Sequence, residues 1–216
     1  MPLMIAYFKW AESNPLVLRK ILTNTGKGQL GLQRQDDGGK KLELEKAYTV
    51  NDLIFRMIAY DDADSYVLLY ENMPSDRLDR VFKDLYVEYD PQNQDDLLSL
   101  YTFGSFFRVL YNASYLSEEM SEKALRYLSR SSFRVGMASG IPRNIDIVSK
   151  HGERRISITT DSGEKELSQL HEFGIIYHPT RPFLLGIMVR GVDYDKLGKI
   201  VRDITHLVYE EVDKQS

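Results

Sequence analysis

The spacing of hydrophobic residues changes character after Ser129. Before this point apolar positions recur every three or four residues, which is the period of a helix with one buried face. After it come short apolar runs separated by turns that contain Gly, Pro or Asp, and then one long amphipathic segment. The pattern predicts helices at Pro2–Ser13, Pro15–Leu22, Thr49–Ile58, Asp61–Glu71, Ser75–Leu85, Thr102–Asn112, Ser117–Leu128 and Tyr194–Val212, and strands at Ile145–Val148, Glu153–Thr159, Phe173–Tyr177 and Phe183–Val189. This order indicates an α+β fold in which helices flank an antiparallel sheet. Since no long linker interrupts it, we expect a single domain over residues 1–216.

The first helix is unusual because it is apolar on several sides and begins at residue 1 with no capping residue before it. We expect Met1–Trp10 to be buried, and we expect a further segment to precede it. Two alternating runs, Gln29–Gln33 and Lys41–Glu45, surround a turn sequence of Asp and Gly residues, which predicts a β-hairpin.

The amino-acid composition and net charge exclude several classes of function. The chain has 216 residues, 43% hydrophobic and 28% charged, which is typical of a folded globular protein. The formal charge of -4 argues against nucleic acid as a partner, because phosphate binding needs clustered surplus cations. The absence of cysteine excludes disulfides and thiolate chemistry. The apolar runs fall short of the ~20 residues of a membrane-spanning helix, and the start lacks the basic leader of a signal peptide.

Common catalytic and cofactor motifs are incomplete. His171-Glu172 would need a second histidine four residues after the first to form a zinc-protease motif, and Ile175 stands there. The four histidines show no metal-ligand spacing, and Gly26-Lys27-Gly28 does not match a phosphate-binding loop. The sequence therefore predicts neither a metal nor a cofactor.

Several segments together carry a family pattern. In order and spacing the chain resembles the class A β-lactamases and related penicillin-recognising serine hydrolases. The segments that match are Met57–Asp64 at the family's helix and S-D-N loop, Gly140-Ile141-Pro142, Ile145–Ser149, Lys150-His151-Gly152 at the K-T-G strand, Phe173–Pro179, the strand Phe183–Val189 and the last helix. The resemblance implies a β-lactamase/transpeptidase-like fold, a β-lactam or peptidoglycan-like ligand, and an extracytoplasmic setting at a bacterial cell wall.

The resemblance also assigns roles to individual residues. In the family, a serine nucleophile and a lysine one turn later (S-x-x-K) attack the substrate, S-D-N assists proton transfer, and K-T-G provides a cation and part of the oxyanion hole. The catalytic positions are matched by Lys150, Asp62 and Asp61. Four other residues fall at positions that bind substrate in the family: His151, Gly152, Ala63 and Arg190.

This chain departs from the family at each motif. The S-x-x-K residues would lie just before Met1, together with two strands of the family fold. At S-D-N stands Asp61-Asp62-Ala63, at K-T-G stands Lys150-His151-Gly152, and the acid that activates the deacylating water has only Glu88 as a candidate, with Gln92 in place of asparagine. We therefore expect an inactive β-lactamase-like domain. The alternative is a hydrolase or D,D-peptidase whose nucleophile belongs to a longer parent chain.

Each assigned residue also has a simpler interpretation. Lys150 would be a solvent-facing lysine at the start of a strand and His151 an ordinary exposed histidine. The two aspartates would be acids at the N-terminus of a helix, where they favour the helix dipole, and Arg190 would form a surface pair. If the two strands of the family fold are absent, Phe183–Val189 becomes an unpaired apolar edge. We then expect it to pair with a second chain, giving a homo-oligomer, or to be covered by another segment such as Gln29–Glu45.

Overall fold

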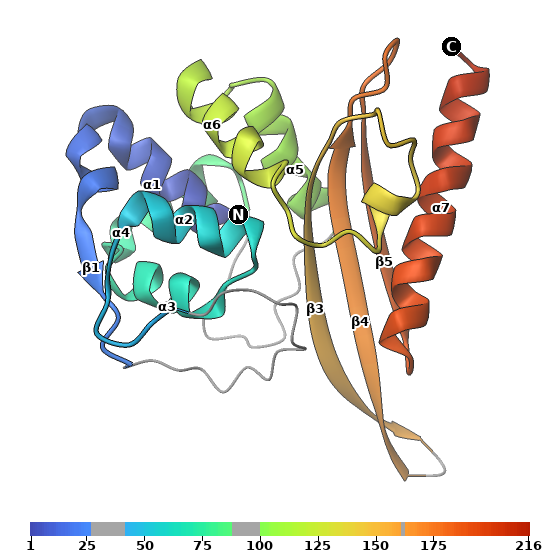
Figure 1. Ribbon diagram of the computed structural model, residues 1–216, viewed down its shortest axis with the longest axis horizontal. Coiled ribbons are helices and arrows are strands. Elements are labelled where there is room, and N and C mark those ends of the chain that lie inside the picture. The colour runs from blue at the N-terminus through green and yellow to red at the C-terminus, as the bar shows by residue number, and fades with distance from the viewer. Residues whose placement is uncertain (27–41, 88–99, 161–162) are drawn as a thin grey trace. The chain divides into compact units, whose positions relative to one another are not determined.

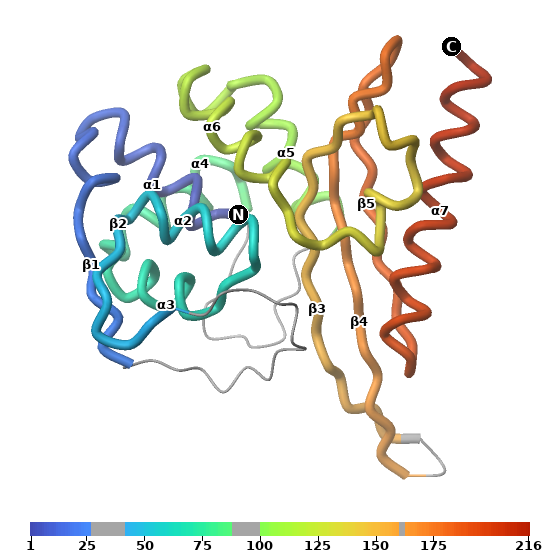
Figure 2. Tube along the Cα trace, viewed as in Figure 1, coloured from blue at the N-terminus to red at the C-terminus, as the bar shows by residue number. Residues whose placement is uncertain are grey.

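The computed structural model describes residues 1–26, 42–87, 100–160 and 163–216 (Figures 1 and 2). These residues form two compact units, the first from residues 1–98 and 108–132 and the second from residues 99–107 and 133–216. The helices are α1 (Pro2–Ser13), η1 (Pro15–Arg19, a 3-10 helix), α2 (Val50–Ala59), α3 (Ala63–Glu71), α4 (Ser75–Asp84), α5 (Leu100–Tyr111), α6 (Glu118–Leu128), η2 (Met137–Ser139, a 3-10 helix) and α7 (Tyr194–Lys214). The strands are β1 (Ile21–Thr23), β2 (Ala47–Thr49), β3 (Ile147–Thr160), β4 (Gly163–Ile176) and β5 (Phe183–Gly191).

Helix α1 forms the core of the first unit. Seven of its twelve residues are buried, which confirms the expectation of a buried first helix. Its one polar core group, the hydroxyl of Tyr7, donates a hydrogen bond of 2.8 Å to the carbonyl of Leu69 in α3. Burial raises the pKa of Tyr7 well above its usual range, so the phenol stays neutral and keeps this hydrogen bond.

The predicted starts of two helices are confirmed at the level of their caps. Thr49 accepts a hydrogen bond of 3.1 Å from the backbone N–H of Asp52, and its own hydroxyl donates to the Asp52 carboxylate at 2.7 Å. Ser117 caps α6 by accepting from the N–H of Met120. The bounds of α1 agree with the prediction, and where the bounds of the other α-helices differ from it, they do so by one or two residues.

Two local predictions are wrong in the first unit. The helix expected over Pro15–Leu22 stops at Arg19, and the chain then enters β1, which pairs antiparallel with β2. Residues Leu42–Lys46 lead into β2 through a turn, so the strand expected at Lys41–Glu45 is not formed in its described part. The other half of that hairpin, Gln29–Gln33, lies outside the described residues.

The second unit is built on a three-stranded antiparallel sheet of order β3-β4-β5 (Figure 1). β3 and β4 form a hairpin of fourteen residue pairs, from Ile147 opposite Ile176 to Thr160 opposite Gly163. The sequence divided β3 into two strands, because residues 149–152 show no apolar alternation, and it missed the first ten residues of β4, most of which are polar. The antiparallel sheet itself is confirmed.

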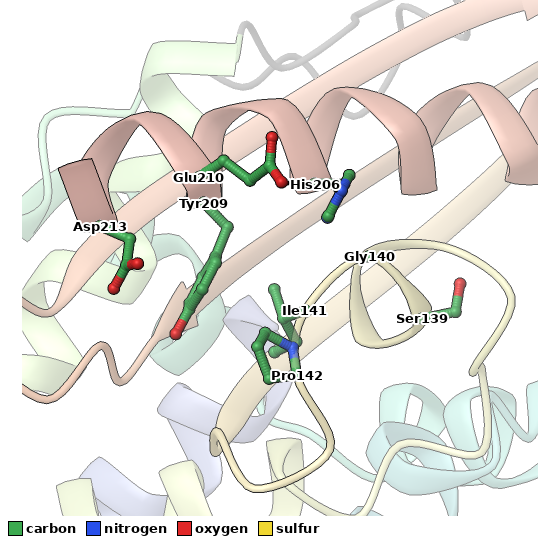
Figure 3. A pocket seen from close by; sticks show the side chains of 8 residues that line it. All are labelled: Ser139, Gly140, Ile141, Pro142, His206, Tyr209, Glu210 and Asp213. Carbon is green, nitrogen blue, oxygen red and sulfur yellow. Dashed lines mark ion pairs between the residues drawn. The ribbon is translucent and has the colours of Figure 1, made fainter.

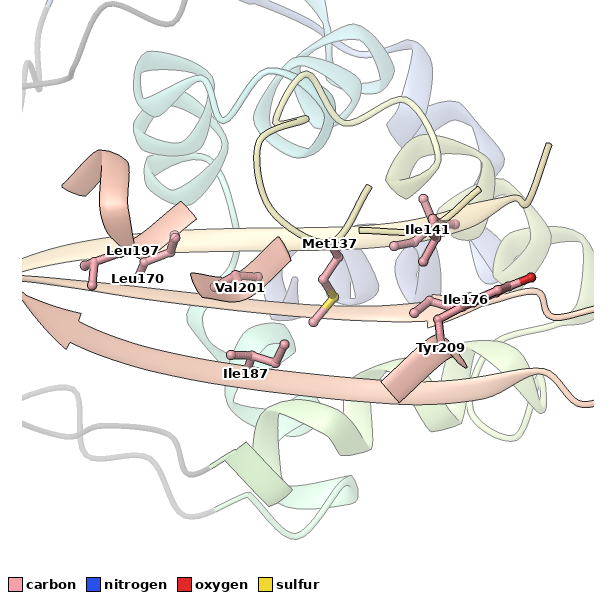
Figure 4. Close-up of a cluster of buried hydrophobic side chains, with 9 residues drawn as sticks. Met137, Ile141, Leu170, Ile176, Ile187, Leu197, Val201 and Tyr209 are labelled. Carbon is pink, nitrogen blue, oxygen red and sulfur yellow. The ribbon is translucent and has the colours of Figure 1, made fainter. Parts of the chain in front are cut away.

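Helices cover both faces of this sheet. On one face α7 packs on β4 and β5 around a buried apolar cluster that includes Leu170, Ile187 and Val201 (Figure 4). On the other face the first half of α5 contacts β4, with the rings of Phe103 and Phe173 at 4.6 Å. Among the helices that the structure describes, none is sufficiently long and apolar to cross a membrane.

Candidate functional site

The segment that matches S-D-N lies in the first unit, at the junction of α2 and α3. α2 ends at Ala59, and Asp61 follows with a φ of 53°, in the left-handed region. This conformation turns the chain sharply, so that Asp62 can cap α3 and Ala63 becomes its first helical residue. The structure thus places all three residues on a tight connection between two helices.

Asp62 is 3% exposed, and its carboxylate is surrounded by donors. One oxygen accepts from the N–H groups of Asp64 at 3.1 Å and Ser65 at 3.4 Å, and the other accepts from the hydroxyl of Ser65 at 3.0 Å. The guanidinium of Arg56 lies 3.9 Å from the same carboxylate. The simpler interpretation of Asp62 as a helix-capping acid is therefore confirmed.

The segment that matches K-T-G lies in the second unit, within β3. Lys150, His151 and Gly152 pair with Phe173, Glu172 and His171 of β4. They are the fourth to sixth residues of a continuous strand of fourteen, and β3 is an outer strand of the described sheet. A position inside a regular strand fixes which face each side chain occupies.

Lys150 is 8% exposed, so the interpretation as a solvent-facing lysine is wrong. Its ammonium group donates to the carbonyl oxygen of His151 at 2.8 Å. The ring of His151 stacks on Phe133 with centroids 4.1 Å apart and planes 13° apart. A cation is therefore held in place beside the strand backbone, although the hydroxyl of the family motif is replaced by a stacked imidazole.

Gly152 lets the imidazole ring of His171 lie close to the backbone of β3, because glycine has no side chain. A β-carbon at this position would lie 2.3 Å from the Nε2 atom of His171 on the neighbouring strand. No larger residue fits unless the imidazole moves, which explains the glycine by packing alone.

A buried carboxyl group that was not predicted from the sequence lies on β4, opposite His151. Glu172 is completely buried, and its Oε2 atom accepts a hydrogen bond of 2.9 Å from the N–H of Met137 in η2. Burial raises the pKa of Glu172 to about 7, although the Met137 N–H, the Ser149 side chain and the charge of Lys150 all act in the opposite direction. The sequence does contain a signal for this buried acid, because Glu172 directly precedes an apolar run, but the sequence pattern considered above for Glu172 was the zinc-protease motif alone.

Arg190 fits the surface interpretation. It is exposed near the end of β5, and its guanidinium donates to the side-chain carbonyl of Gln169 at 3.1 Å. Gln169 is 1% exposed and also donates to the sulfur of Met188. Arg190 thus completes the hydrogen bonds of a buried amide.

A separate hollow of about 450 Å³ lies between the η2 loop and α7 (Figure 3). Its lining combines backbone and apolar groups of the loop with polar groups of the helix: Ser139, Gly140, Ile141, Pro142, His206, Tyr209, Glu210 and Asp213. Across the described ranges, no group of three or more His, Asp or Glu side chains is arranged to hold a metal ion. Glu88 and Gln92 fall in a part of the chain that is not described.

The fold and these two segments define a β-lactamase-like protein, and known structures agree. A mutant of PBP-A in an acyl-enzyme complex with penicillin G is similar with a TM-score of 0.73 and 16% identity, over 99% of this chain and 79% of that one. A β-lactamase from Xanthomonas campestris pv. campestris has a TM-score of 0.74 and 16% identity, over 98% and 80% of the two chains. A β-lactamase from Chitinophaga pinensis has the same TM-score and identity, over 98% and 82%. At this identity the likeness establishes the fold alone.

The family follows from the sequence itself. Residues 1–212 match the model of the Beta-lactamase enzyme family, and the chain belongs to that family. No curated protein matches the chain. The resemblance drawn from the scattered motifs is therefore confirmed, as is the fold class.

Proposed function

We propose that residues 1–216 act as one β-lactamase-like domain that holds a carboxylate-bearing ligand without hydrolysing it. The ligand would be a β-lactam or a peptidoglycan-like peptide, bound through the ammonium group of Lys150. In this proposal the fold of a serine hydrolase serves for binding, and the chemistry of the family is not carried out by this polypeptide.

The observation that carries the proposal is the state of the Asp61-Asp62-Ala63 segment. Its middle carboxylate accepts three hydrogen bonds within the cap of α3, which ties it to a structural role. Its neighbours provide neither the hydroxyl for proton transfer nor the amide that would hold a substrate. A carboxylate at Asp61 would also repel a substrate carboxylate.

The first helix supports the same conclusion. A reactive serine needs a base on the same face, one turn later. Within α1 the only serine is Ser13 and the only lysine is Lys9, in the reverse order. Lys9 is moreover paired with Glu12 at 2.8 Å and donates to the carbonyl of Tyr115.

A fluorescent penicillin and a chromogenic cephalosporin test the proposal. We expect no covalent labelling of the chain 1–216 and no cephalosporin hydrolysis above the buffer rate. We also expect reversible binding of penicillin G in calorimetry, lost in Lys150→Met and kept in the control Lys165→Met, which changes an exposed lysine of β4. Covalent labelling or turnover would refute the inactive domain. Binding that survives Lys150→Met would refute the role of the lysine.

The second candidate is a penicillin-recognising hydrolase or D,D-peptidase whose nucleophile lies in a longer parent chain. Lys150 favours it, because the cation that would meet a substrate carboxylate is present and held by a backbone carbonyl. It predicts that the chain 1–216 stays unlabelled, whereas an N-terminally extended chain is acylated by the penicillin. Failure of the extended chain to react would leave the binding domain as the better account.

Two further elements belong to the proposal. We place the protein outside the cytoplasm, at a bacterial cell wall, because of the family to which it belongs. We also infer that it self-associates through the edge strand β5, which pairs only with β4 among the described strands. An apolar strand with an open edge favours pairing with another strand.

A further inference from the structure

The carboxyl group of Glu172 lies in the apolar layer on the face of the sheet that α7 covers. Its neighbours on the adjacent strands are His151 of β3 and Ile187 of β5. Ile187 and Met137 belong to the buried cluster of Figure 4. Among the described residues, the Oε1 atom of Glu172 has no hydrogen-bond partner. Burying a polar atom in this way is costly, so the presence of a carboxyl group here needs an explanation.

Glu172 holds the η2 segment onto the sheet. Its Oε2 atom accepts the hydrogen bond from the N–H of Met137. The backbone of Gly136 lies against the same oxygen and against the ring of Phe133, so closely that no β-carbon fits at this glycine. The Phe133 ring in turn stacks on the imidazole of His151, with centroids 4.1 Å apart. The carboxyl group and the His151 ring are thus connected by packed contacts on one face of the sheet.

These contacts continue to the ammonium group of Lys150. The carbonyl oxygen of His151 accepts a hydrogen bond from this ammonium group at 2.8 Å. Side chains alternate between the two faces of a strand, so Lys150 lies on the same face as its partner Phe173, whose ring contacts α5. Glu172 lies on the opposite face, and its charge and that of Lys150 act on each other through the sheet. A change at the carboxyl group can therefore reach the lysine through the contacts and through its charge.

From these contacts we propose that Glu172 is a positioning residue for the binding of a carboxylate at Lys150, and that ionisation of Glu172 weakens this binding. The inference rests on the proposed function and adds the regulation of the same site by pH. An ionised Glu172 repels the ligand carboxylate and balances part of the lysine charge, whereas a neutral Glu172 does neither. The coupling is reciprocal, so a bound carboxylate also favours the protonated form of Glu172.

The direction of the pH dependence follows from the groups around Glu172. Burial raises the pKa of Glu172 to about 7, so this carboxyl group is mostly neutral at pH 5.5 and mostly ionised at pH 8.5. Of the described elements packed against it, β3 presents the imidazole of His151 and, through the sheet, the charge of Lys150. β5 presents Ile187, η2 presents a backbone N–H, and α7 adds apolar side chains such as Val201. A protonated His151 would also attract a carboxylate at low pH, so variants have to separate the two groups.

Calorimetric titration of the chain 1–216 with penicillin G at pH 5.5, 7 and 8.5 tests the coupling. We expect the dissociation constant to rise about tenfold over this range, the order expected for two charges about 12 Å apart at an effective dielectric constant of about 20. Glu172→Gln keeps an oxygen that accepts from the N–H of Met137, and should bind at pH 8.5 about as tightly as the parent protein binds at pH 5.5. Glu166→Gln, the same change at an exposed side chain of β4, should keep the pH dependence of the parent protein.

Two more variants separate the effect of the charge from that of the contacts. Glu172→Leu removes the acceptor for the N–H of Met137, so it should bind more weakly than Glu172→Gln at every pH, with its fold checked by circular dichroism. Equal binding by these two variants would overturn the positioning role. His151→Phe keeps an aromatic ring on Phe133 and should retain the pH dependence of the parent protein. A dependence that is lost in His151→Phe and kept in Glu172→Gln would assign it to the histidine and refute the proposal.

The coupling can also be measured without a ligand, which separates this inference from the proposed function. In NMR spectra of the parent protein, the amide proton of Met137 and the ε-methylene group of Lys150 should both shift with a midpoint of about pH 7, and both shifts should be lost in Glu172→Gln. If these shifts are observed but penicillin G does not bind at any pH, the proposed function is refuted while the coupling of Glu172 to Lys150 is confirmed. If the Lys150 resonance does not respond to Glu172, the coupling is refuted even where penicillin G binds.

Discussion

The buried carboxyl of Glu172 makes the stability of the second unit depend on pH. In an unfolded chain this group titrates near 4.5, and in the folded protein burial raises its pKa to about 7. Between these values the folded state binds more protons than the unfolded state. The free energy of unfolding therefore falls as the pH rises from about 4.5 to about 7, and is level beyond.

The magnitude follows from the change in pKa. One pKa unit corresponds to about 1.4 kcal/mol, so ionising Glu172 inside the protein costs about 3 kcal/mol. Glu172→Gln removes the titration, while the amide carbonyl can still accept the hydrogen bond from Met137. We expect the variant to gain about 2–3 kcal/mol over the parent protein when the pH is raised from 4.5 to 8.

Urea unfolding followed by circular dichroism at pH 4.5, 6 and 8 measures this gain. Glu166→Gln is the matched control, since it makes the same chemical change on β4 at a side chain that is 63% exposed. The control should differ from the parent protein by the same amount at every pH. If Glu172→Gln also shows a difference that is independent of pH, the carboxyl is not neutralised by burial and the reasoning is wrong.

A further prediction concerns the segment that matches S-D-N. Asp62→Ala should lower the free energy of unfolding by about 1–3 kcal/mol in urea titration, because it removes the cap of α3 and leaves Arg56 without this partner. Asp62→Asn should keep most of the stability, because its amide oxygen can still accept from the N–H groups at the start of α3, and equal losses in the two variants would contradict the capping role.

The sequence predicted the elements whose signals are local. Thr49 and Ser117 marked helix starts because a cap is decided within four residues. The helical period of α7 was regular enough to predict its start at Tyr194 and its end to within two residues. The first ten residues of β4 were missed because most of them are polar, and only their pairing with β3 defines them as a strand.

The environment of each candidate site residue depends on residues that are distant in the sequence. The structural roles of Gly152 and Asp62 depend on contacts that the motifs do not contain: the His171 ring on β4 and the Arg56 guanidinium on α2. Glu172 was not predicted as a buried acid, because its environment is produced by η2 folding back over the sheet, thirty-five residues away in sequence. Contacts between residues so far apart in the sequence do not appear in the spacing of hydrophobic residues, so this spacing cannot predict them.

Asp62 and Lys150, which match positions of two family motifs, are held by different kinds of contact. Removing Asp62 would expose the N–H groups at the start of α3, so the aspartate is needed by the fold whether or not a substrate binds. Lys150 donates to the carbonyl oxygen of His151, and its charge also acts on the buried carboxyl of Glu172. Substitution of Asp62 therefore tests the start of α3, whereas substitution of Lys150 tests the binding of a carboxylate that the proposed function assigns to it.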